Sequence, residues 1–245
     1  MSDITEISRE KLTLSLQNSG VSLPFRLLSL AQAKTVTESV IPKLELTPVA
    51  GATTALTTRH LDNQQIYSVA TDRKILDRLL PVLGERIVLW QSHFFIKDGH
   101  QARVPWHQDA YHWPLQPRVA ISAWLALTTV TEESGCLKLI PGMKNQLLPT
   151  RRVVSPCHRL FREEAVLTAS HFKQAINMTL DPGEAFLFDS YIPHASLINT
   201  SGKKRIALAM RYTRSDVKVD VKHPLVYLER QDGQWVETGR SEAEN

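Results

Sequence analysis

The chain has 245 residues, of which 42% are hydrophobic and 22% are charged, and its formal net charge is +4. This composition is typical of a globular protein with a sizeable core and excludes a disordered chain. The excess of positive charge is small, and the densest basic stretches, Arg151-Arg152 and Lys203-Lys204-Arg205, have no interleaved aromatic residues, so no nucleic-acid partner is expected.

The first third of the chain is predicted to be mainly helical. Ser2 or Asp3 can cap a helix that runs toward Gly20. Ser29 can cap a second helix, which Pro42 is expected to end because proline lacks the backbone N–H that a helix interior needs.

The clearest helix follows Asp72, which is a good N-cap residue, and Gly84 suits the left-handed position after its end. Helical spacing places three apolar side chains on one face of this helix: Ile75, Leu79 and Leu80.

From residue 85 onward the pattern is that of strands. The stretch RIVLWQSHFFIK, residues 86–97, is rich in β-branched and aromatic residues, and strict alternation places four side chains on one face: Leu89, Gln91, His93 and Phe95. Gly and Pro turns separate the further strand candidates, which are residues 120–130, 135–142, 176–190, 194–199 and 205–214.

The polar segment at about residues 151–175 interrupts the strands and resembles a lid or side insertion. Asp232-Gly233 lies between two alternating runs and predicts a closing hairpin at about residues 224–239.

Many short strands after a helical start predict an all-β core, an antiparallel sandwich or barrel, with flanking helices. No internal repeat and no low-complexity linker divides the sequence. We therefore expect one domain over residues 1–245, with a helical part at about 1–84, a strand core at about 85–220 and the terminal hairpin.

The two cysteines, Cys136 and Cys157, have no redox-like or metal-like spacing, which excludes a disulfide scaffold and favours a reducing compartment. The N-terminal stretch is charged throughout, and no run approaches the ~18 apolar residues of a membrane span. A cytoplasmic location without a membrane partner is expected, and the oligomeric state is not predicted.

His107 and Asp109 lie two residues apart in WHQDAYHW, residues 106–113, so on an extended chain their side chains project from the same face and can bind one ion together. A pattern this short often occurs by chance. The second observation is His194 on a strand-like run, with Arg205 eleven residues later at the start of the next strand. Two imidazoles and one carboxylate form the facial triad of non-haem Fe(II) oxygenases.

These segments resemble the phytanoyl-CoA dioxygenase (PhyH) family of Fe(II)/2-oxoglutarate-dependent oxygenases, from about residue 87 to 212. The resemblance rests on WHQDAYHW, on AWLALTTVTEESGCLKLIPGMK and on HASLINTSGKKR. It implies a double-stranded β-helix, also called a cupin-like jelly roll, in which His107, Asp109 and His194 hold iron. It further implies that Arg205 binds the distal carboxylate of 2-oxoglutarate, helped by Ser196, with Trp124 lining the cosubstrate pocket.

Other roles stay open at this stage. Ser196 can instead bond the backbone. Arg211 shares the face of Arg205 and is a rival partner for the carboxylate, but six residues along a strand span about 20 Å, so only one of the two can serve it. Gln91 and His93 can line the cosubstrate site or face solvent.

The substrate side is expected to include aromatic residues that would look the same from sequence if they only packed in the core: Tyr111, Trp113 and Phe95. Lys97 and His112 have no assigned role.

The predicted function is oxidation of an unactivated C–H bond, most simply hydroxylation, in a small molecule of specialised metabolism. Fe(II), 2-oxoglutarate and O₂ are the cofactors that the resemblance implies, with succinate and CO₂ as co-products. Related halogenases lack the carboxylate ligand that Asp109 supplies here, which favours hydroxylation. Two alternatives stay open: a non-catalytic cupin-like metal-binding or sensing protein, and a metal-assisted hydrolase.

Overall fold

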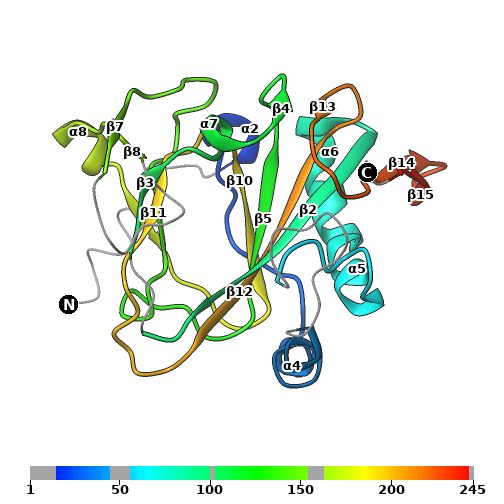
Figure 1. Ribbon diagram of the computed structural model, residues 1–245, viewed down its shortest axis with the longest axis horizontal. Helices are drawn as coiled ribbons and strands as arrows, with labels where there is room; N and C mark the ends of the chain where they lie inside the picture. The colour runs from blue at the N-terminus through cyan, green and yellow to red at the C-terminus, as the bar shows by residue number, and fades with distance from the viewer. Residues whose placement is uncertain (1–14, 45–55, 100–102, 154–162, 243–245) are drawn as a thin grey trace.

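The computed structural model describes residues 15–44, 56–99, 103–153 and 163–242 (Figure 1). The helices are α2 (Leu16–Ser19), α3 (Leu30–Thr35), the π-helix η1 (Val36–Val40), α4 (Ile41–Leu44), α5 (Gln64–Ala70), α6 (Arg73–Leu83), α7 (Asp109–His112) and α8 (Ala169–Phe172).

Most strands belong to two sheets. The larger sheet has the order β1 (Phe25–Arg26), β10 (Glu184–Asp189), β5 (Ile121–Ala126), β12 (Arg205–Arg214), β2 (Arg86–Lys97), β14 (Val226–Gln231) and β15 (Gln234–Arg240). The smaller sheet has the order β3 (Val104–His107), β11 (His194–Ser196), β6 (Leu137–Leu139) and β9 (Ile176–Met178). Two short antiparallel pairs are β4 (Leu115–Gln116) with β13 (Lys218–Val219), and β7 (Thr150–Arg152) with β8 (Glu163–Ala165).

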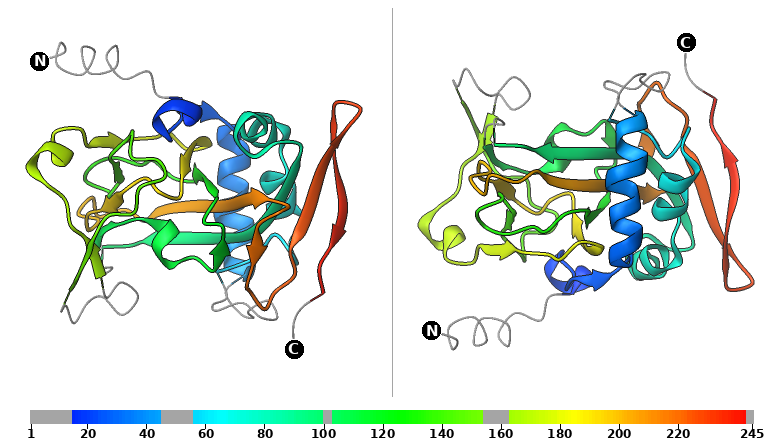
Figure 2. Two further views of the ribbon diagram at one scale, coloured as in Figure 1. Left: turned by 90° about the horizontal axis from the view of Figure 1, so that it is seen from above. Right: turned by 90° about the horizontal axis from the view of Figure 1, so that it is seen from below.

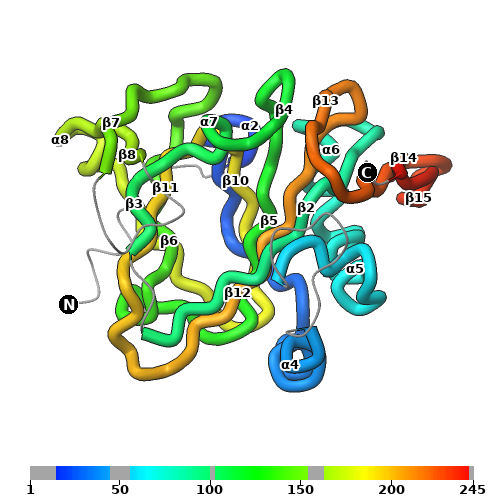
Figure 3. Tube along the Cα trace, in the orientation of Figure 1, coloured from blue at the N-terminus to red at the C-terminus, as the bar shows by residue number. Residues whose placement is uncertain are grey.

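The two sheets face each other, and the tube in Figure 3 shows the smaller sheet, with β3, β11 and β6, opposite β10, β5 and β12. Apolar side chains from both inner faces form one cluster, to which Trp124 and Phe186 contribute from the larger sheet and Leu139 and Met178 from the smaller one. The antiparallel jelly roll that the resemblance implied is therefore confirmed.

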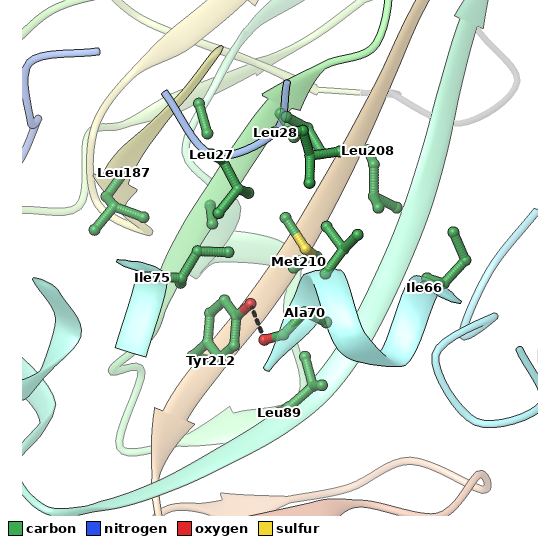
Figure 4. Close-up of a cluster of buried hydrophobic side chains, with 14 of the residues drawn as sticks. Leu27, Leu28, Ile66, Ala70, Ile75, Leu89, Leu187, Leu208, Met210 and Tyr212 are labelled. Carbon is green, nitrogen blue, oxygen red and sulfur yellow. Dashed lines mark hydrogen bonds between the residues drawn. The ribbon is translucent and has the colours of Figure 1, made fainter. Parts of the chain in front are cut away.

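Helices cover the outer face of the larger sheet. The continuous helix formed by α3, η1 and α4 crosses it, beside α5 and α6 (Figure 2). The resulting core includes the fully buried Tyr212, whose hydroxyl donates a hydrogen bond of 2.7 Å to the carbonyl of Ala70 at the end of α5 (Figure 4). Because helices cover one face of β5 and the smaller sheet covers the other, every residue of that strand is buried.

Two expectations about the helices were wrong. The helix capped by Ser29 does not end at Pro42, which lies inside α4. The wider π-turn of η1 precedes this proline, and such turns relieve the clash between a proline ring and the preceding carbonyl groups. In α6 the buried face contains Leu76 and Leu83 with Ile75 and Leu79, while Leu80 is only half-buried.

The alternation predicted for β2 holds on one side of a bulge only. Arg211 of β12 pairs with Gln91, but the next residue, Tyr212, pairs with Leu89, so Trp90 is an extra residue in β2. Leu89 therefore belongs to the outer core under the helices and not to the face of Gln91, His93 and Phe95.

The run 176–190 forms two strands in different sheets, β9 and β10, and not one strand, because the turn at Gly183 carries the chain across. The predicted hairpin is confirmed, with Asp232 and Gly233 both at positive φ between β14 and β15. Cys136 is buried, and Cys157 and the expected cap at Ser2 or Asp3 lie outside the described residues. Within the described ranges, no helix is long and apolar enough to span a membrane.

Candidate metal and cosubstrate site

Three potential metal ligands come together between the two sheets. His107 ends β3 and lies directly opposite His194, the first residue of β11, in the antiparallel pairing of the smaller sheet. After β3 the chain turns into α7, whose first residue is Asp109. One ligand atom from each of the three side chains lies within 4.8 Å of the other two, and all three residues are buried.

Backbone carbonyls fix both imidazole rings. His107 Nδ1 lies 2.9 Å from the carbonyl of Pro105, and His194 Nδ1 lies 3.0 Å from that of Ile192. A carbonyl can only accept, so each Nδ1 carries the proton and each Nε2 keeps its lone pair. These Nε2 atoms lie 3.6 Å and 3.9 Å from the carboxylate oxygens of Asp109, and the two imidazoles and the carboxylate therefore converge on one point.

The electrostatics of the cluster suit a cation. Burial alone would raise the pKa of Asp109, but the neighbouring His194, His107 and Arg211 outweigh it and lower this pKa to about 2. Burial, and then the neighbouring His107, lower the pKa of His194 to about 4. A carboxylate and a neutral imidazole are the protonation states that bind a metal.

Gln108, the residue between the first two ligands, is buried and fixes their position. Its amide nitrogen donates to the carbonyls of Gln146 (2.7 Å) and Tyr191 (2.5 Å), and its oxygen accepts from the backbone N–H of Leu148 at 2.7 Å. Sequence reasoning gave this residue no role. A polar side chain between two ligands was the available signal, because it must point away from them on an extended chain.

Arg205 lies at the start of β12 on the inner face, and it is buried without a salt bridge to any described carboxylate. Its guanidinium carbon is 5.4 Å from the ring centroid of Trp124, and its Nε has no hydrogen-bond partner. Burial lowers the pKa of Arg205 to about 10, so it keeps its charge at neutral pH. An unpaired buried guanidinium is a ready partner for a carboxylate.

Lys97, which had no role in the sequence reading, lies directly opposite Arg205 in the sheet. Its ammonium donates to the hydroxyl of Ser196 at 2.9 Å and to the carbonyl of Leu197. Burial, and then the charge of Arg205, lower the pKa of Lys97 to about 8. Ser196 thus accepts a hydrogen bond from a side chain, and the site has two cations where one was expected.

Arg211 lies on the same inner face, six residues along β12, and its Nη1 donates to Gln91 Oε1 from the opposite strand. Its guanidinium carbon is 4.7 Å from the ring centroid of Trp113. His93 follows on this face and packs against Phe95 with a centroid distance of 4.3 Å. Burial, and then the charge of Arg211, lower the pKa of His93 to about 3, so this imidazole is neutral.

Tyr111 is 42% exposed, and its hydroxyl lies 3.4 Å from Thr150 Oγ1 at the start of β7. The segment predicted as a lid or side insertion contains β7, β8 and α8, and Phe172 of α8 packs edge-on against Trp106 of β3. Through Phe172 the segment thus contacts the strand that leads to His107.

The residues present fit Fe(II), because three side chains offer two imidazole nitrogens and a carboxylate from one side and leave the other side to exchangeable ligands. They also fit 2-oxoglutarate, because two buried cations, Arg205 and Lys97, have no described carboxylate partner.

Known proteins share the fold and part of the sequence of this chain. The "Probable phytanoyl-CoA dioxygenase" of Caenorhabditis elegans is 30% identical over 126 residues, 47% of this chain and 38% of the relative. A "non-heme monooxygenase; ThoJ apo" has a TM-score of 0.71 at 21% identity, covering 94% of this chain and 85% of that structure. "CytC3 with Fe(II) and alpha-ketoglutarate" has a TM-score of 0.62 at 25% identity, covering 83% of this chain and 76% of that structure.

The expectation of Fe(II) and 2-oxoglutarate as cofactors is confirmed by this likeness together with the triad. The chain spans only 38% to 57% of the length of the first curated relatives it matches. The family model described as "Phytanoyl-CoA dioxygenase (PhyH)" matches residues 39–207, more than half of the chain and all three potential ligands. The chain therefore belongs to the phytanoyl-CoA dioxygenase family.

Proposed function

We propose that this protein is an Fe(II)/2-oxoglutarate-dependent dioxygenase that hydroxylates an unactivated C–H bond of a small molecule, in specialised metabolism. The observation that carries the proposal is the convergence of two Nε2 atoms and one carboxylate, within 4.8 Å of one another, on the inner face that also holds two unpaired cations. A sensor or a hydrolase would have no need of those cations.

In this proposal His107, Asp109 and His194 hold the iron. The carbonyls of Pro105 and Ile192 keep both imidazoles in the tautomer that leaves Nε2 free. Iron(II) with 2-oxoglutarate and O₂ supplies the oxidising chemistry: one oxygen atom enters the substrate C–H bond as a hydroxyl group, and the other enters succinate as CO₂ is lost.

Arg205 and Lys97 bind the distal carboxylate of 2-oxoglutarate, with Ser196 oriented by the Lys97 ammonium and Trp124 beside the arginine. Trp113, Tyr111 and Phe95 border the substrate. The role of the protein is to hold both molecules in position and to keep the cosubstrate's distal carboxylate away from water. Ionic contacts of this carboxylate are stronger in the protein interior than in water.

Succinate formation tests the proposal. Protein incubated with Fe(II), ascorbate, O₂ and 2-oxoglutarate is expected to form succinate slowly without a substrate, and Asp109→Ala should abolish this. Arg205→Gln should raise the concentration of 2-oxoglutarate at half-maximal rate by at least about tenfold, since a charge-assisted bidentate contact is lost. Iron binding without succinate would instead favour the sensing or hydrolase function.

A further inference from the structure

The inner face of β12 carries a second arginine that the proposed cofactors leave unused. Arg205 and Arg211 point to the same face, six residues apart, which corresponds to about 20 Å along a strand. One carboxylate cannot contact both arginines, and the distal carboxylate of 2-oxoglutarate is assigned to Arg205. Arg211 also lies beyond residues 39–207, the part of the chain that the family model matches.

Arg211 lies at the metal end of this face. Phe188 aligns with Ser122 and Ser122 with Arg211 across the neighbouring strands, and Phe188 packs edge-on against His194 with a centroid distance of 4.9 Å. The charge of Arg211 also contributes to lowering the pKa of Asp109. The guanidinium is therefore close to the metal ligands, on the side away from Arg205 and Lys97.

The side chain is held firmly but its charge is not neutralised. Trp113 and Trp90 pack edge to face, with ring centroids 5.1 Å apart, and the guanidinium carbon lies 4.7 Å and 5.9 Å from these centroids. Gln91 accepts a hydrogen bond from Nη1. The Nε has no hydrogen-bond partner, and among the described residues Arg211 forms no salt bridge. A neutral amide thus occupies the position in which a glutamate would have formed an internal ion pair.

This arrangement is costly for a structural arginine, because a desolvated cation normally needs an anionic partner. It is well suited to an external anion, since a guanidinium held in advance against aromatic rings binds a carboxylate or oxyanion through two parallel hydrogen bonds. With Fe(II) and 2-oxoglutarate bound, the positive charges on this face still outnumber the negative ones.

We propose that Arg211 binds an anionic group of the substrate, a carboxylate or an oxyanion of phosphorus or sulfur, and that Trp113 packs against the adjoining apolar part. The inference rests on the proposed function and specifies its substrate class: a small anionic molecule whose reacting carbon lies a short distance from its charged group. Of the two inner-face arginines, Arg205 then binds the cosubstrate and Arg211 binds the substrate.

The test uses the full chain loaded with Mn(II), which does not turn over, and saturating 2-oxoglutarate, so that Arg205 is already occupied. Acetate, methylphosphonate and sulfate are titrated separately, with acetamide as the neutral match for acetate. Tryptophan fluorescence is recorded because Trp113 and Trp90 both lie against Arg211. We expect saturable changes with at least one anion and none with acetamide. The ranking of the three anions identifies the charged group.

Two variants decide the assignment. Arg211→Met should weaken the binding of the preferred anion by about ten- to a hundredfold, the range for a lost charge-assisted pair. Gln91→Glu keeps the arginine and the size of its partner but supplies an internal carboxylate, so it should weaken anion binding similarly while the melting temperature stays at or above that of the wild type. This second variant gives a result even if the first does not fold.

Unchanged anion affinity in Gln91→Glu, or no response of the wild type to any of the three anions, would overturn the assignment. So would a loss of 2-oxoglutarate binding in Arg211→Met with normal binding in Arg205→Met, which would give Arg211 the cosubstrate. Before the anions are added, the Mn(II)-loaded wild type is titrated with 2-oxoglutarate. This titration tests the proposed function separately, because its outcome does not depend on the added anions.

Discussion

Replacing Gln108 with leucine should loosen the metal site and destabilise the fold together. The glutamine makes three hydrogen bonds to the backbone of two loops, at Gln146, Leu148 and Tyr191. Leucine has a similar size and no polar atoms. The N–H of the buried Leu148 would then lack an acceptor, which costs about 1–3 kcal/mol.

The lost hydrogen bonds to the two carbonyls cost less stability, about 0.5–1.5 kcal/mol each. Gln146 is exposed and Tyr191 is half-buried, so water can replace the amide as the donor. The greater hydrophobicity of leucine offsets part of this loss. We expect the free energy of unfolding to fall by about 2–4 kcal/mol, which lowers the melting temperature of a chain this long by about 5–15 °C.

The assay combines thermal unfolding of the metal-free protein with an Fe(II) titration under anaerobic conditions. Iron affinity should fall by about 10–100-fold, the usual effect of removing a contact that supports metal ligands. Gln174→Leu is the matched control, because Gln174 is exposed and its replacement should change stability by less than about 0.5 kcal/mol. A Gln108→Leu protein that melts with the control and binds iron like the wild type would refute this account of Gln108.

Three further predictions concern the charged and buried polar groups. Lys97→Met should weaken 2-oxoglutarate binding by about tenfold at pH 7. The affinity of the wild type should also fall as the pH rises through about 8, where Lys97 loses its proton. Calorimetry that finds the same dependence of 2-oxoglutarate affinity on pH in both proteins would contradict this. Tyr212→Phe removes the hydrogen bond to the carbonyl of Ala70, and urea unfolding should show a loss of about 1–2 kcal/mol, whereas an unchanged midpoint would mean that the bond contributes nothing. Burial lowers the pKa of His60 and His93 to about 3, below the value of 6.5 in an unfolded chain, so the unfolded state takes up protons first as the pH falls. The contribution of these two neutral side chains to the free energy of unfolding is fully present above pH 6.5 and should be lost as the pH drops toward 3. A urea midpoint that stays constant between pH 7 and 4 would exclude this.

The sequence predicted the elements whose signal is local. The Asp72 cap, the Asp232-Gly233 turn and the strand over residues 205–214 each depend on a few neighbouring residues, and all three are present in the structure. The predicted helix end at Pro42 was wrong because the local preference of proline was outweighed by the π-turn before it and by the apolar face that the whole helix packs on the sheet.

The features that sequence could not supply depend on pairing between distant segments. The bulge at Trp90 exists only in the register of β2 with β12, so alternation along β2 alone placed Leu89 on the wrong face. A role for Lys97 in binding the cosubstrate can be inferred only from the strand pairing that places it opposite Arg205. Gln108 likewise matters because two remote loops come within hydrogen-bond distance.

The most direct test of the central claim is an anaerobic titration with Fe(II) followed by 2-oxoglutarate, recorded in the visible spectrum. Chelation of the iron by the keto acid gives a weak charge-transfer band. We expect this band to form at one equivalent of each in the wild type, to be absent in Asp109→Ala, to require more 2-oxoglutarate in Arg205→Gln, and to disappear on admission of O₂ as succinate forms. Iron bound at the triad with no band at saturating 2-oxoglutarate would contradict the assignment of this protein as a 2-oxoglutarate-dependent oxygenase.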